Sequence, residues 1–272
     1  SPAEVANNVI GIGKAKAGNK PYKLFLLGIL AGMFIALAAV GANTASCTIA
    51  NASVGKLVGA CIFPVGLLMV LVAGSELFTG NNLIIVSVLT GDVKWGAMLK
   101  NWVIVYLGNF VGSMLVALLV VYAGQFNLFG GALAVTTISV ATGKASLAFG
   151  PAILKGILCN FLVCIAVWIS FAAKSVGGKL AGIYLPIMLF VLAGFEHSVA
   201  NMYYVPAGLL AKMNPTALAA ATDAGIAVDQ LTWGNFFINN LIPVTIGNII
   251  GGAVLVGVMY WAIYLADAKK AD

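Results

Sequence analysis

Apolar residues gather in six long runs along the chain, separated by shorter segments rich in Lys, Gly, Asn and Ser. An α-helix needs about 20 apolar residues to cross the hydrocarbon core of a bilayer. The second and fifth runs are too long for one plain span, and each carries a polar interruption. The pattern therefore predicts an all-α membrane protein of six transmembrane helices, with the second and fifth broken. The runs cover residues 24–45, 57–89, 97–122, 150–173, 181–210 and 233–265.

The two interruptions resemble each other. The segment GSELFTGN (residues 74–81) aligns without gaps with GFEHSVAN (194–201). The alignment superimposes two Glu residues and two Asn residues, whereas Leu77 faces His197. Interrupted membrane helices at matching positions in two halves of a chain are typical of a substrate site near the bilayer midplane. We therefore expect a permeation site where the two broken helices meet.

The duplication continues on both sides of the interruptions, so each half of the chain is one repeat of three helices. Before the interruption, LGILAGMF (27–34) aligns with LKGILCNF (154–161); after it, NWVIVYLGNFVG (101–112) aligns with NLIPVTIGNIIG (240–251). Three crossings is an odd number, so the second repeat enters the membrane from the opposite side and the repeats are inverted. We expect a single channel domain, residues 1–272, with repeats at about 24–123 and 150–265.

Composition places the chain in a lipid bilayer rather than in water. Hydrophobic residues make up 62% of the chain and charged residues only 8%, and the mean hydropathy is +1.06. The net charge of +6 comes entirely from Lys. Arg, whose planar fork suits phosphate, is absent from the sequence, so we exclude nucleic acid as a partner.

The Lys residues fall on two sides of the predicted membrane, and their imbalance sets the orientation. Under the positive-inside rule, both termini face the cytoplasm, with the protein in the plasma or inner membrane. The first span lacks a small-residue cleavage site, so we expect a membrane helix rather than a signal peptide. The chain starts at Ser1 without Met, so we expect some trimming of the N-terminus. The cytoplasmic set is Lys14, Lys16, Lys20, Lys23, Lys94, Lys100, Lys174, Lys179, Lys269 and Lys270; the opposite set is Lys56, Lys144, Lys155 and Lys212.

Gly and Cys residues in the spans indicate packing rather than chemistry. Two GxxxG motifs, at residues 28–32 and 108–112, predict close helix packing within the subunit. The four Cys residues form no CxxC motif and are expected to be buried free thiols. They are Cys47, Cys61, Cys159 and Cys164.

The acidic and imidazole side chains inside the predicted spans are the candidates for chemistry, and they are Glu76, Glu196 and His197. A charge in hydrocarbon costs at least about 2.5–3.5 kcal/mol on insertion scales, so each needs a partner or a wet cavity. The symmetric positions of the two Glu residues favour a structural role, in which they accept hydrogen bonds from the broken backbone. His197 breaks the symmetry, which favours a role in the pore.

The side chain of His197 suits a permeation site for anions. Neutral imidazole presents one donor and one acceptor, and protonated imidazole is a cation that can return its proton. Thr79, on the other broken helix, is expected to form a hydrogen bond with it across the site. With one His and no carboxylate or thiol cluster in the sequence, we expect no metal and no other cofactor.

Four segments together are similar to the formate/nitrite transporter family, and they are GSELFTGN, LKGILCNFLVC, AGFEHSVANM and NLIPVTIGNIIGG. The resemblance covers nearly the whole chain. It implies a homopentamer of aquaporin-like protomers in the lipid bilayer, each with its own pore for small monovalent anions such as hydrosulfide, formate or nitrite. Gly80 and Asn81 follow Thr79 where formate-type members carry hydroxyl residues. The sequence therefore looks close to the hydrosulfide channel branch, and hydrosulfide is the favoured substrate.

The resemblance also implies roles for residues that the pattern alone does not distinguish. Its cytoplasmic gate and constriction comprise Phe63, Leu67, Leu77, Phe78 and Thr79; its outer constriction is Phe190; its polar pore positions are Asn160 and Asn248; and its entrance lysine is Lys144. From the pattern alone, the Phe and Leu residues are apolar core. The two Asn residues fit helix–helix hydrogen bonds as well as pore lining, and Lys144 is a solvated charge on a loop.

A mechanism combines these roles. Positive potential draws the anion to the pore, and an apolar constriction strips its water, which is costly for a bare charge. Half-helix dipoles and His197 offset part of that cost. His197 acts either by a hydrogen bond to the anion or by donating a proton, so that a neutral acid crosses.

Three alternatives to a passive anion channel follow from the same sequence. An aquaporin-type channel for neutral solutes requires paired Asn-Pro-Ala motifs, and the chain has one Asn-Pro, at residues 214–215. A proton-coupled anion transporter is compatible with the same residues. A membrane-embedded enzyme requires a nucleophile–base pair, a metal cluster or a phosphate loop, none of which the sequence contains, so we expect that the protein is not an enzyme.

Overall fold

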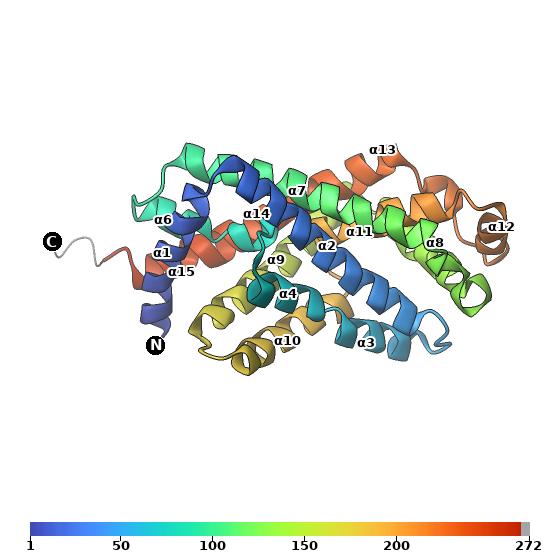
Figure 1. Ribbon diagram of the computed structural model, residues 1–272, viewed down its shortest axis with the longest axis horizontal. Coiled ribbons are helices and arrows are strands. Elements are labelled where there is room, and N and C mark those ends of the chain that lie inside the picture. Colours follow the sequence, from blue (N-terminus) through green and yellow to red (C-terminus); the bar gives the residue numbers. More distant parts are fainter. Residues whose placement is uncertain (268–272) are drawn as a thin grey trace.

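The computed structural model describes residues 1–267, and the regular structure in that part of the chain is entirely helical (Figure 1). Lys269 and Lys270, which we assigned to the cytoplasmic side, lie outside the described residues. The helices are α1 (Pro2–Gly18), α2 (Pro21–Ser46), α3 (Ala52–Ile62), α4 (Val65–Met69), η1 (Val70–Gly74), α5 (Phe78–Asn81), α6 (Ile84–Leu89), α7 (Trp95–Tyr122), η2 (Gln125–Gly131), α8 (Ala132–Ala145), α9 (Phe149–Ala172), α10 (Val176–Leu192), α11 (Ser198–Ala211), α12 (Pro215–Asp223), η3 (Val228–Gln230), α13 (Trp233–Asn235), η4 (Phe236–Leu241), α14 (Ile242–Ile249), η5 (Ile250–Val258) and α15 (Met259–Tyr264).

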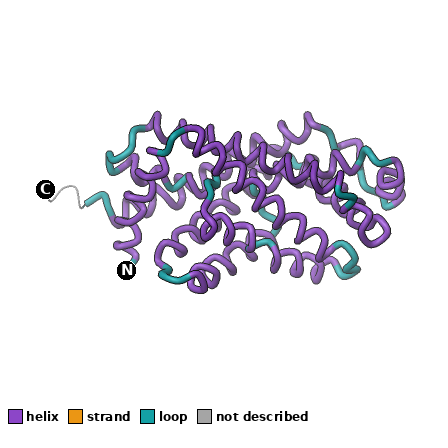
Figure 2. The backbone as a smooth tube through the Cα atoms, in the orientation of Figure 1, coloured by secondary structure: helices purple, strands orange, loops and turns teal. Residues whose placement is uncertain are grey.

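The all-α membrane architecture agrees with the hydrophobic pattern. Six continuous helical stretches among the described residues are long and apolar enough to cross a membrane, and five of them coincide with predicted spans. The remaining predicted span, residues 181–210, consists of the two shorter helices α10 and α11. One stretch was not predicted: residues 125–145, which we treated as a loop, form η2 and α8. Figure 2 shows loops inside the bundle as well as at its ends.

The two broken spans are interrupted at the same kind of backbone turn. Gly74 and Gly194 have positive φ values of 87° and 73°, a conformation that glycine adopts without steric cost. Beyond each turn the chain crosses the bundle without helical hydrogen bonds, so its polar groups need other partners. The amide of Glu76 donates to the carbonyl of Leu27 at 3.2 Å, and the amide of Glu196 donates to that of Lys155 at 3.3 Å. Each break is thus held by the first long helix of its own repeat.

Glycine faces hold each repeat together within the chain. Helices α2 and α7 pack so closely that a Cβ atom on Gly32 would overlap the backbone of Asn109, and one on Gly112 would overlap the carbonyl of Ile29. Helices α9 and α14 make the same contact, through Gly156 and Gly247. Both predicted GxxxG motifs therefore lie at a helix crossing inside the subunit, as expected.

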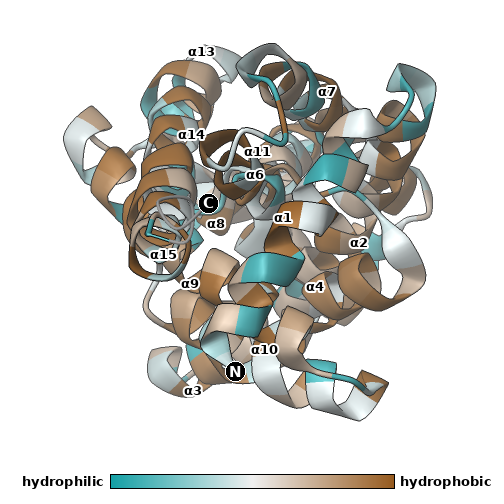
Figure 3. Cartoon of the chain, turned by 90° about the vertical axis from the view of Figure 1, so that its left-hand side faces the viewer, coloured by the Kyte–Doolittle hydropathy of each residue, from teal (hydrophilic) through white to brown (hydrophobic). Residues whose placement is uncertain are grey.

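An additional helix precedes each repeat at corresponding positions. Helix α1 packs beside α6, α7, α9 and α15 at one end of the molecule, and α8 packs along α11 nearer the other end (Figure 1). Figure 3 shows hydrophilic residues on α1, whereas the helices around it are largely hydrophobic. Helices α1 and α8 thus lie just before residues 24 and 150, where the apolar runs of the two repeats begin.

Candidate functional site

The two broken helices meet at a hydrogen bond between the two halves of the chain. Helix α5 begins after Leu77 and helix α11 after His197, which are the N-cap positions of the two half-helices. Nε2 of His197 lies 2.9 Å from Oγ1 of Thr79. Both side chains are buried, with relative exposures of 3% and 0%. The interruption pattern placed both residues at the meeting point, and the structure brings them together there.

The second ring nitrogen of His197 identifies the tautomer. Nδ1 accepts a hydrogen bond from the backbone amide of Ala200 at 3.1 Å and so caps α11. A backbone amide can only donate, so Nδ1 carries no proton and the hydrogen of the neutral ring is on Nε2. Nε2 then donates to Oγ1 of Thr79, and the hydroxyl hydrogen of Thr79 is free to point elsewhere. When His197 is neutral, the Thr79 hydroxyl therefore accepts from Nε2 and can donate its own hydrogen to another group, such as a bound ligand.

Two buried Asn residues clamp the breaks in the same way in both repeats. Nδ2 of Asn109 donates to the carbonyls of Gly28 at 2.8 Å and Glu76 at 2.9 Å, and its Oδ1 accepts from the amide of Phe78 at 2.9 Å. Asn248 makes the equivalent bonds to Gly156, Glu196 and Ser198, at 2.9–3.0 Å. Each Asn therefore ties the first turn of a half-helix to its flanking spans. We predicted that Asn248 is a polar pore position. In the structure, both the oxygen and the nitrogen of its side-chain amide form hydrogen bonds with backbone groups.

The predicted pore residue Asn160 is also fully buried. Its Nδ2 lies 2.7 Å from the carbonyl of Asn248, 2.8 Å from Oδ1 of Asn82 and 3.3 Å from the carbonyl of Thr79. These contacts connect α9 to the first broken helix, through Thr79 and Asn82, and to α14, through Asn248. Asn160 therefore fixes the position of Thr79 from behind.

Each break also carries a buried cluster of one Lys, one Glu and two Asn. In the first, the Lys16 cluster, Nζ of Lys16 lies 2.9 Å from Oε1 of Glu76. Nδ2 of Asn81 donates to Glu76 at 2.6 Å and to Asn101 at 2.8 Å. The carboxylate is thereby paired and hydrogen-bonded, as a buried charge requires.

The second cluster, the Lys144 cluster, repeats this arrangement in the other half. Nζ of Lys144 lies 3.0 and 3.1 Å from the two carboxylate oxygens of Glu196. Asn201 donates to Glu196 at 2.6 Å and to Asn240 at 2.7 Å. Nζ of Lys144 also lies 5.1 Å from the ring centre of Tyr204. We predicted that Lys144 lies on a loop; it lies in the last turn of α8, where the helix aims it at the carboxylate.

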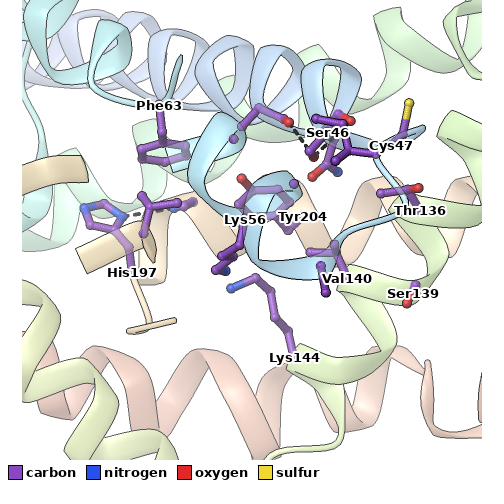
Figure 4. Close-up of a pocket in the computed structure, with 18 of the residues that line it drawn as sticks. Ser46, Cys47, Lys56, Phe63, Thr136, Ser139, Val140, Lys144, His197 and Tyr204 are labelled. Carbon is purple, nitrogen blue, oxygen red and sulfur yellow. Dashed lines mark hydrogen bonds between the residues drawn. The ribbon is translucent and has the colours of Figure 1, made fainter. Parts of the chain in front are cut away.

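An open cavity, the Lys144 vestibule, leads towards the meeting point from the side of α3 and α8 (Figure 4). Its volume is about 480 Å³, and its lining includes polar residues of α2 and α8 and, at the inner end, His197. The lining contains two ammonium groups, those of Lys56 and Lys144. This side of the site is therefore wide, open and positively charged.

On the opposite side, the cavity next to the Lys16 cluster is small. The Lys16 pocket has a volume of about 40 Å³ and is lined by Leu67, Leu77, Gly80 and Phe171, among others. Helix α1 covers this region, and Oγ of Ser87 in α6 donates to the carbonyl of Ile10 in α1 at 2.9 Å. In this structure the site is open to the Lys144 vestibule and nearly closed towards the Lys16 pocket.

Two aromatic rings form a constriction at the inner end of the vestibule, where they line the cavity together with His197. The ring centres of Phe63 and Phe190 are 5.7 Å apart in an edge-to-face arrangement, and Phe190 stacks on His197 at 6.0 Å. We predicted that Phe63 and Leu67 form one constriction and Phe190 the other. The structure instead groups Phe63 with Phe190 in the vestibule, whereas Leu67, one helical turn further, lines the Lys16 pocket. Residues one turn apart on a helix at the midplane thus face opposite sides of the site.

Phe78, which we predicted as part of the gate, packs away from both cavities. Its ring lies 4.9 Å from that of Tyr106 and 6.1 Å from that of Trp102, both on α7. Leu77 does line the Lys16 pocket. Of the three gate residues, Leu77 and Thr79 therefore lie at the site, and Phe78 anchors them to the bundle.

Several residues of the site were not among the predicted ones. They are Lys16, Lys56, Asn81, Asn101, Asn109, Asn201 and Asn240. The alignment of the repeats contained a signal for most of them, because Asn occurs in both copies at 81 and 201, 101 and 240, and 109 and 248. An amide that recurs inside an apolar span in both halves indicates an obligatory buried hydrogen bond.

Sequence comparison connects the chain to membrane channels. The family model described as formate/nitrite transporter matches residues 3–262. The formate channel FocA of Escherichia coli strain K12 is 41% identical over 270 residues, which cover 98% of this chain and 95% of that protein. A probable formate transporter of Methanothermobacter thermautotrophicus is 37% identical over 285 aligned positions, covering 98% of both. These relatives are channels and transporters rather than enzymes.

Solved structures agree with this relationship. A structure described as a pentameric formate channel with formate bound has a TM-score of 0.80 and 39% identity, and the match covers 90% of this chain and 98% of that one. An FNT family ion channel has a TM-score of 0.83 and 29% identity, with coverages of 96% and 98%. The predicted fold, with two broken helices in a six-span bundle, is therefore confirmed.

Proposed function

Because the chain belongs to the formate/nitrite transporter family, we propose that each protomer conducts small monovalent anions of weak acids, with formate as the first substrate to test. The observation that carries this proposal is the Thr79–His197 hydrogen bond, buried behind the Phe63–Phe190 constriction and reached from a positively charged vestibule. Such a site attracts anions, removes their water and offers a donor at the narrowest point.

Formate is preferred to hydrosulfide as the leading candidate for two reasons. The named relatives include formate channels. In addition, the sequence argument for hydrosulfide used Gly80 and Asn81, and the amide of Asn81 is committed to Glu76 and Asn101. A residue whose donors are engaged in the scaffold does not select the permeating ion. Hydrosulfide and nitrite are further candidates of the same charge.

In the proposed mechanism, the anion crosses the two Phe rings and then binds the hydroxyl hydrogen of Thr79. The anion loses water at the rings, which is unfavourable for a charge. The Thr79 hydroxyl, polarised by Nε2 of His197, and the N-terminus of α11 offset part of this cost. The vestibule and the site thus share the desolvation of the ion between two steps.

The hydrogen-bonding role of His197 is favoured over the proton-donor role. A proton donor must first become imidazolium, which requires a proton on Nδ1. Nδ1 is the acceptor that caps α11 through Ala200, so protonation replaces an attraction by a contact between two donors. A buried cation next to Phe190 is also poorly solvated. These costs support an anion channel rather than an obligatory proton-coupled transporter.

We infer that the working assembly is a homopentamer in the plasma or inner membrane with both termini in the cytoplasm. A pentameric relative matches 90% of this chain, and α1 and α15 pack together at one end of the protomer. The larger set of Lys residues lies on that side in the sequence prediction, which favours a cytoplasmic location. In this orientation the Lys144 vestibule opens outward.

The test of the proposed function is a flux comparison in proteoliposomes with purified protein. Formate, nitrite, hydrosulfide and glycerol are compared at two pH values, with protein-free vesicles as the control. We expect anion permeability far above the control for formate and no increase for glycerol. Glycerol permeability without anion flux would mean a neutral-solute channel. Flux that strictly requires co-transported protons, measured by an internal pH dye, would mean a coupled transporter.

A further inference from the structure

The Lys144 vestibule contains more positive charge than its ion pair uses. Lys144 is neutralised by Glu196, which it contacts through both carboxylate oxygens. Among residues 1–267, no hydrogen bond or ion pair involves the side chain of Lys56. Lys56 and Lys144 are the charged residues in the lining. The two ammonium groups and the carboxylate therefore leave the vestibule with one net positive charge, and Lys56 is its source.

The two lysines face each other across the same cavity. Figure 4 shows the ends of both side chains converging below Tyr204, although one comes from α3 and the other from α8. Like charges near a low-dielectric wall repel each other, and Lys144 is paired with Glu196 whereas Lys56 has no carboxylate partner among the described residues. An anion between the two ammonium groups removes this repulsion. The space between the two ammonium groups is therefore a favourable position for a small anion.

A hydrogen-bond donor without a partner lies in the same lining. Asn43 in α2 is 94% buried, with 6% exposure, and its Nδ2 has no hydrogen-bond partner among the described residues. The side-chain amide of Asn43 can rotate by a half-turn about its last torsion angle, χ2, which exchanges the positions of Nδ2 and Oδ1. The energy profile of this torsion is broad, so the rotation is accessible. A buried amide hydrogen without an acceptor is unfavourable. Nδ2 is buried in its present position; after this half-turn it takes the position of Oδ1, where an oxygen atom of a bound anion can accept its hydrogen.

The Lys16 pocket lacks the excess charge, although its lining also contains an unpartnered hydroxyl, Oγ of Ser75. Lys16 is paired with Glu76, the cavity is about 40 Å³ in volume, and its lining contains no second Lys. Of the two cavities, only the vestibule therefore carries an excess charge, although the Lys–Glu–Asn clusters are duplicated. An asymmetric feature on a symmetric scaffold points to a function beyond the scaffold.

We propose that the Lys144 vestibule holds a binding position for small monovalent carboxylates and other oxyanions, in which Lys56 supplies the charge and Asn43 a directional hydrogen bond. This inference rests on the proposed anion-channel function and deepens it. The position lies before the Phe63–Phe190 constriction, so it concentrates anions at the point where dehydration begins. Two oxygen acceptors can use the ammonium and the amide together, whereas hydrosulfide offers one weakly accepting sulfur. The position therefore favours formate over hydrosulfide.

The charge is tested with a reporter that does not depend on conduction. Cys47 is a free thiol in the vestibule lining, and burial raises the pKa of this thiol, so the reaction is run at mildly alkaline pH. Negatively and positively charged methanethiosulfonate reagents are compared at low ionic strength, with Cys47→Ser as the background control. In Lys56→Gln, the ratio of anionic to cationic reaction rates is expected to fall about three- to fivefold, the factor for one charge at close range in a watery medium.

Two matched variants distinguish a local site from general surface potential. Lys56→Arg keeps the charge and is expected to keep the wild-type ratio. Lys155→Gln removes a charge that was predicted on the same membrane side but lies outside the vestibule lining, and it is expected to change the ratio by less than about twofold. An unchanged ratio in Lys56→Gln, or an equal fall in Lys155→Gln, would overturn the proposal.

Conduction supplies the second measurement. In planar bilayers with formate at low ionic strength, Lys56→Gln is expected to raise the half-saturating formate concentration about three- to fivefold for one current direction only. Asn43→Leu is expected to lower the permeability ratio of formate to hydrosulfide, and an unchanged ratio would exclude the amide from the site. If the wild type carries no anion current but the reagent ratio still falls, the proposed function fails and the charged position stands. If the wild type conducts and both Lys56→Gln measurements stay at wild-type values, the binding position alone is refuted.

Discussion

Replacing His197 by Asn or by Leu separates the two hydrogen bonds of this side chain. Nδ1 caps α11 and Nε2 binds Thr79. Asn is a favourable N-cap residue, and its amide ends where the first ring atoms of imidazole lie, so it keeps the cap and loses the bond to Thr79. Leu loses both bonds, and it is the residue at the matching N-cap, Leu77, which makes no side-chain cap bond.

The expected magnitudes follow from these contacts. Loss of an N-cap bond costs about 1 kcal/mol, so His197→Leu should be less stable than His197→Asn by about that amount. Loss of a hydrogen bond that acts on an anion costs about 1.5–3 kcal/mol. If Thr79 is no longer oriented by Nε2 and this loss raises the barrier to permeation, formate flux falls about 10- to 100-fold in both variants.

The assay combines thermal unfolding of the purified protein with formate flux in proteoliposomes at several pH values. Lys155→Gln serves as the control for reconstitution, because its side chain lies outside the vestibule lining. His197→Asn is expected to unfold close to the wild type, and its flux is expected to be reduced by the same factor at every pH. Wild-type flux in His197→Asn would refute the donor role. A reduction that depends strongly on pH would refute the neutral tautomer and favour proton donation by His197.

Three further predictions concern the scaffold. Gly112→Ala should destabilise the protein by about 1–3 kcal/mol, because the added Cβ meets the backbone of α2. Gly96→Ala in the same helix is the control: its Cβ meets no atom within 4 Å, so this variant should unfold like the wild type. Equal unfolding temperatures for the two variants would contradict the close crossing of α2 and α7. Glu76→Gln should cost about 3–5 kcal/mol, because it leaves a partly buried ammonium group unpaired, and a cost below about 1 kcal/mol would show that this pair is solvent-screened. Asn109→Ala and Asn248→Ala should each cost about 3 kcal/mol or more, because each removes three buried hydrogen bonds, and widely different unfolding temperatures of the two variants would contradict equivalent clamps.

The sequence determines the spans and the breaks because both depend on local chemistry. A span is defined by the length of its apolar run, and the breaks follow from a Gly with positive φ beside a Glu that hydrocarbon excludes. Helix α8 was missed because residues 125–145 are rich in Gly, Thr and Ser, a composition that reads as a loop although the segment packs against α11. A composition that suits a loop in water also suits a helix that packs closely in a membrane.

The parts of the site that escaped prediction depend on contacts over long sequence distances. Lys16 pairs with Glu76 across 60 positions, whereas from the sequence we assigned Lys16 only a role in membrane orientation. We grouped Phe63 with Leu67 because the family resemblance implies that both belong to one constriction, but one turn of helix separates the two sides of the constriction. Near the midplane of a thin barrier, a displacement of about 6 Å along a helix axis decides which compartment a side chain faces. Sequence proximity therefore does not imply a shared function there.

The division between the symmetric and asymmetric parts of the protomer is itself an argument about transport. The Asn clamps and the Lys–Glu–Asn clusters occur in both repeats, with hydrogen-bond lengths that agree within about 0.2 Å. The clamps form hydrogen bonds with backbone groups of the breaks and the clusters pair the Glu charges, all of which would otherwise be exposed to hydrocarbon. A scaffold of this kind must be complete in both halves, because either unsatisfied break costs several kcal/mol. A permeating anion meets no such requirement, since it needs one donor at the midplane and one attractive cavity. His197 of the second repeat and Lys56 of the first repeat supply these on one side of the protomer, whereas the other side has Leu77 and a pocket whose Lys16 is paired with Glu76. Duplication therefore accounts for the fold of this protein, and departure from it accounts for the path of the ion.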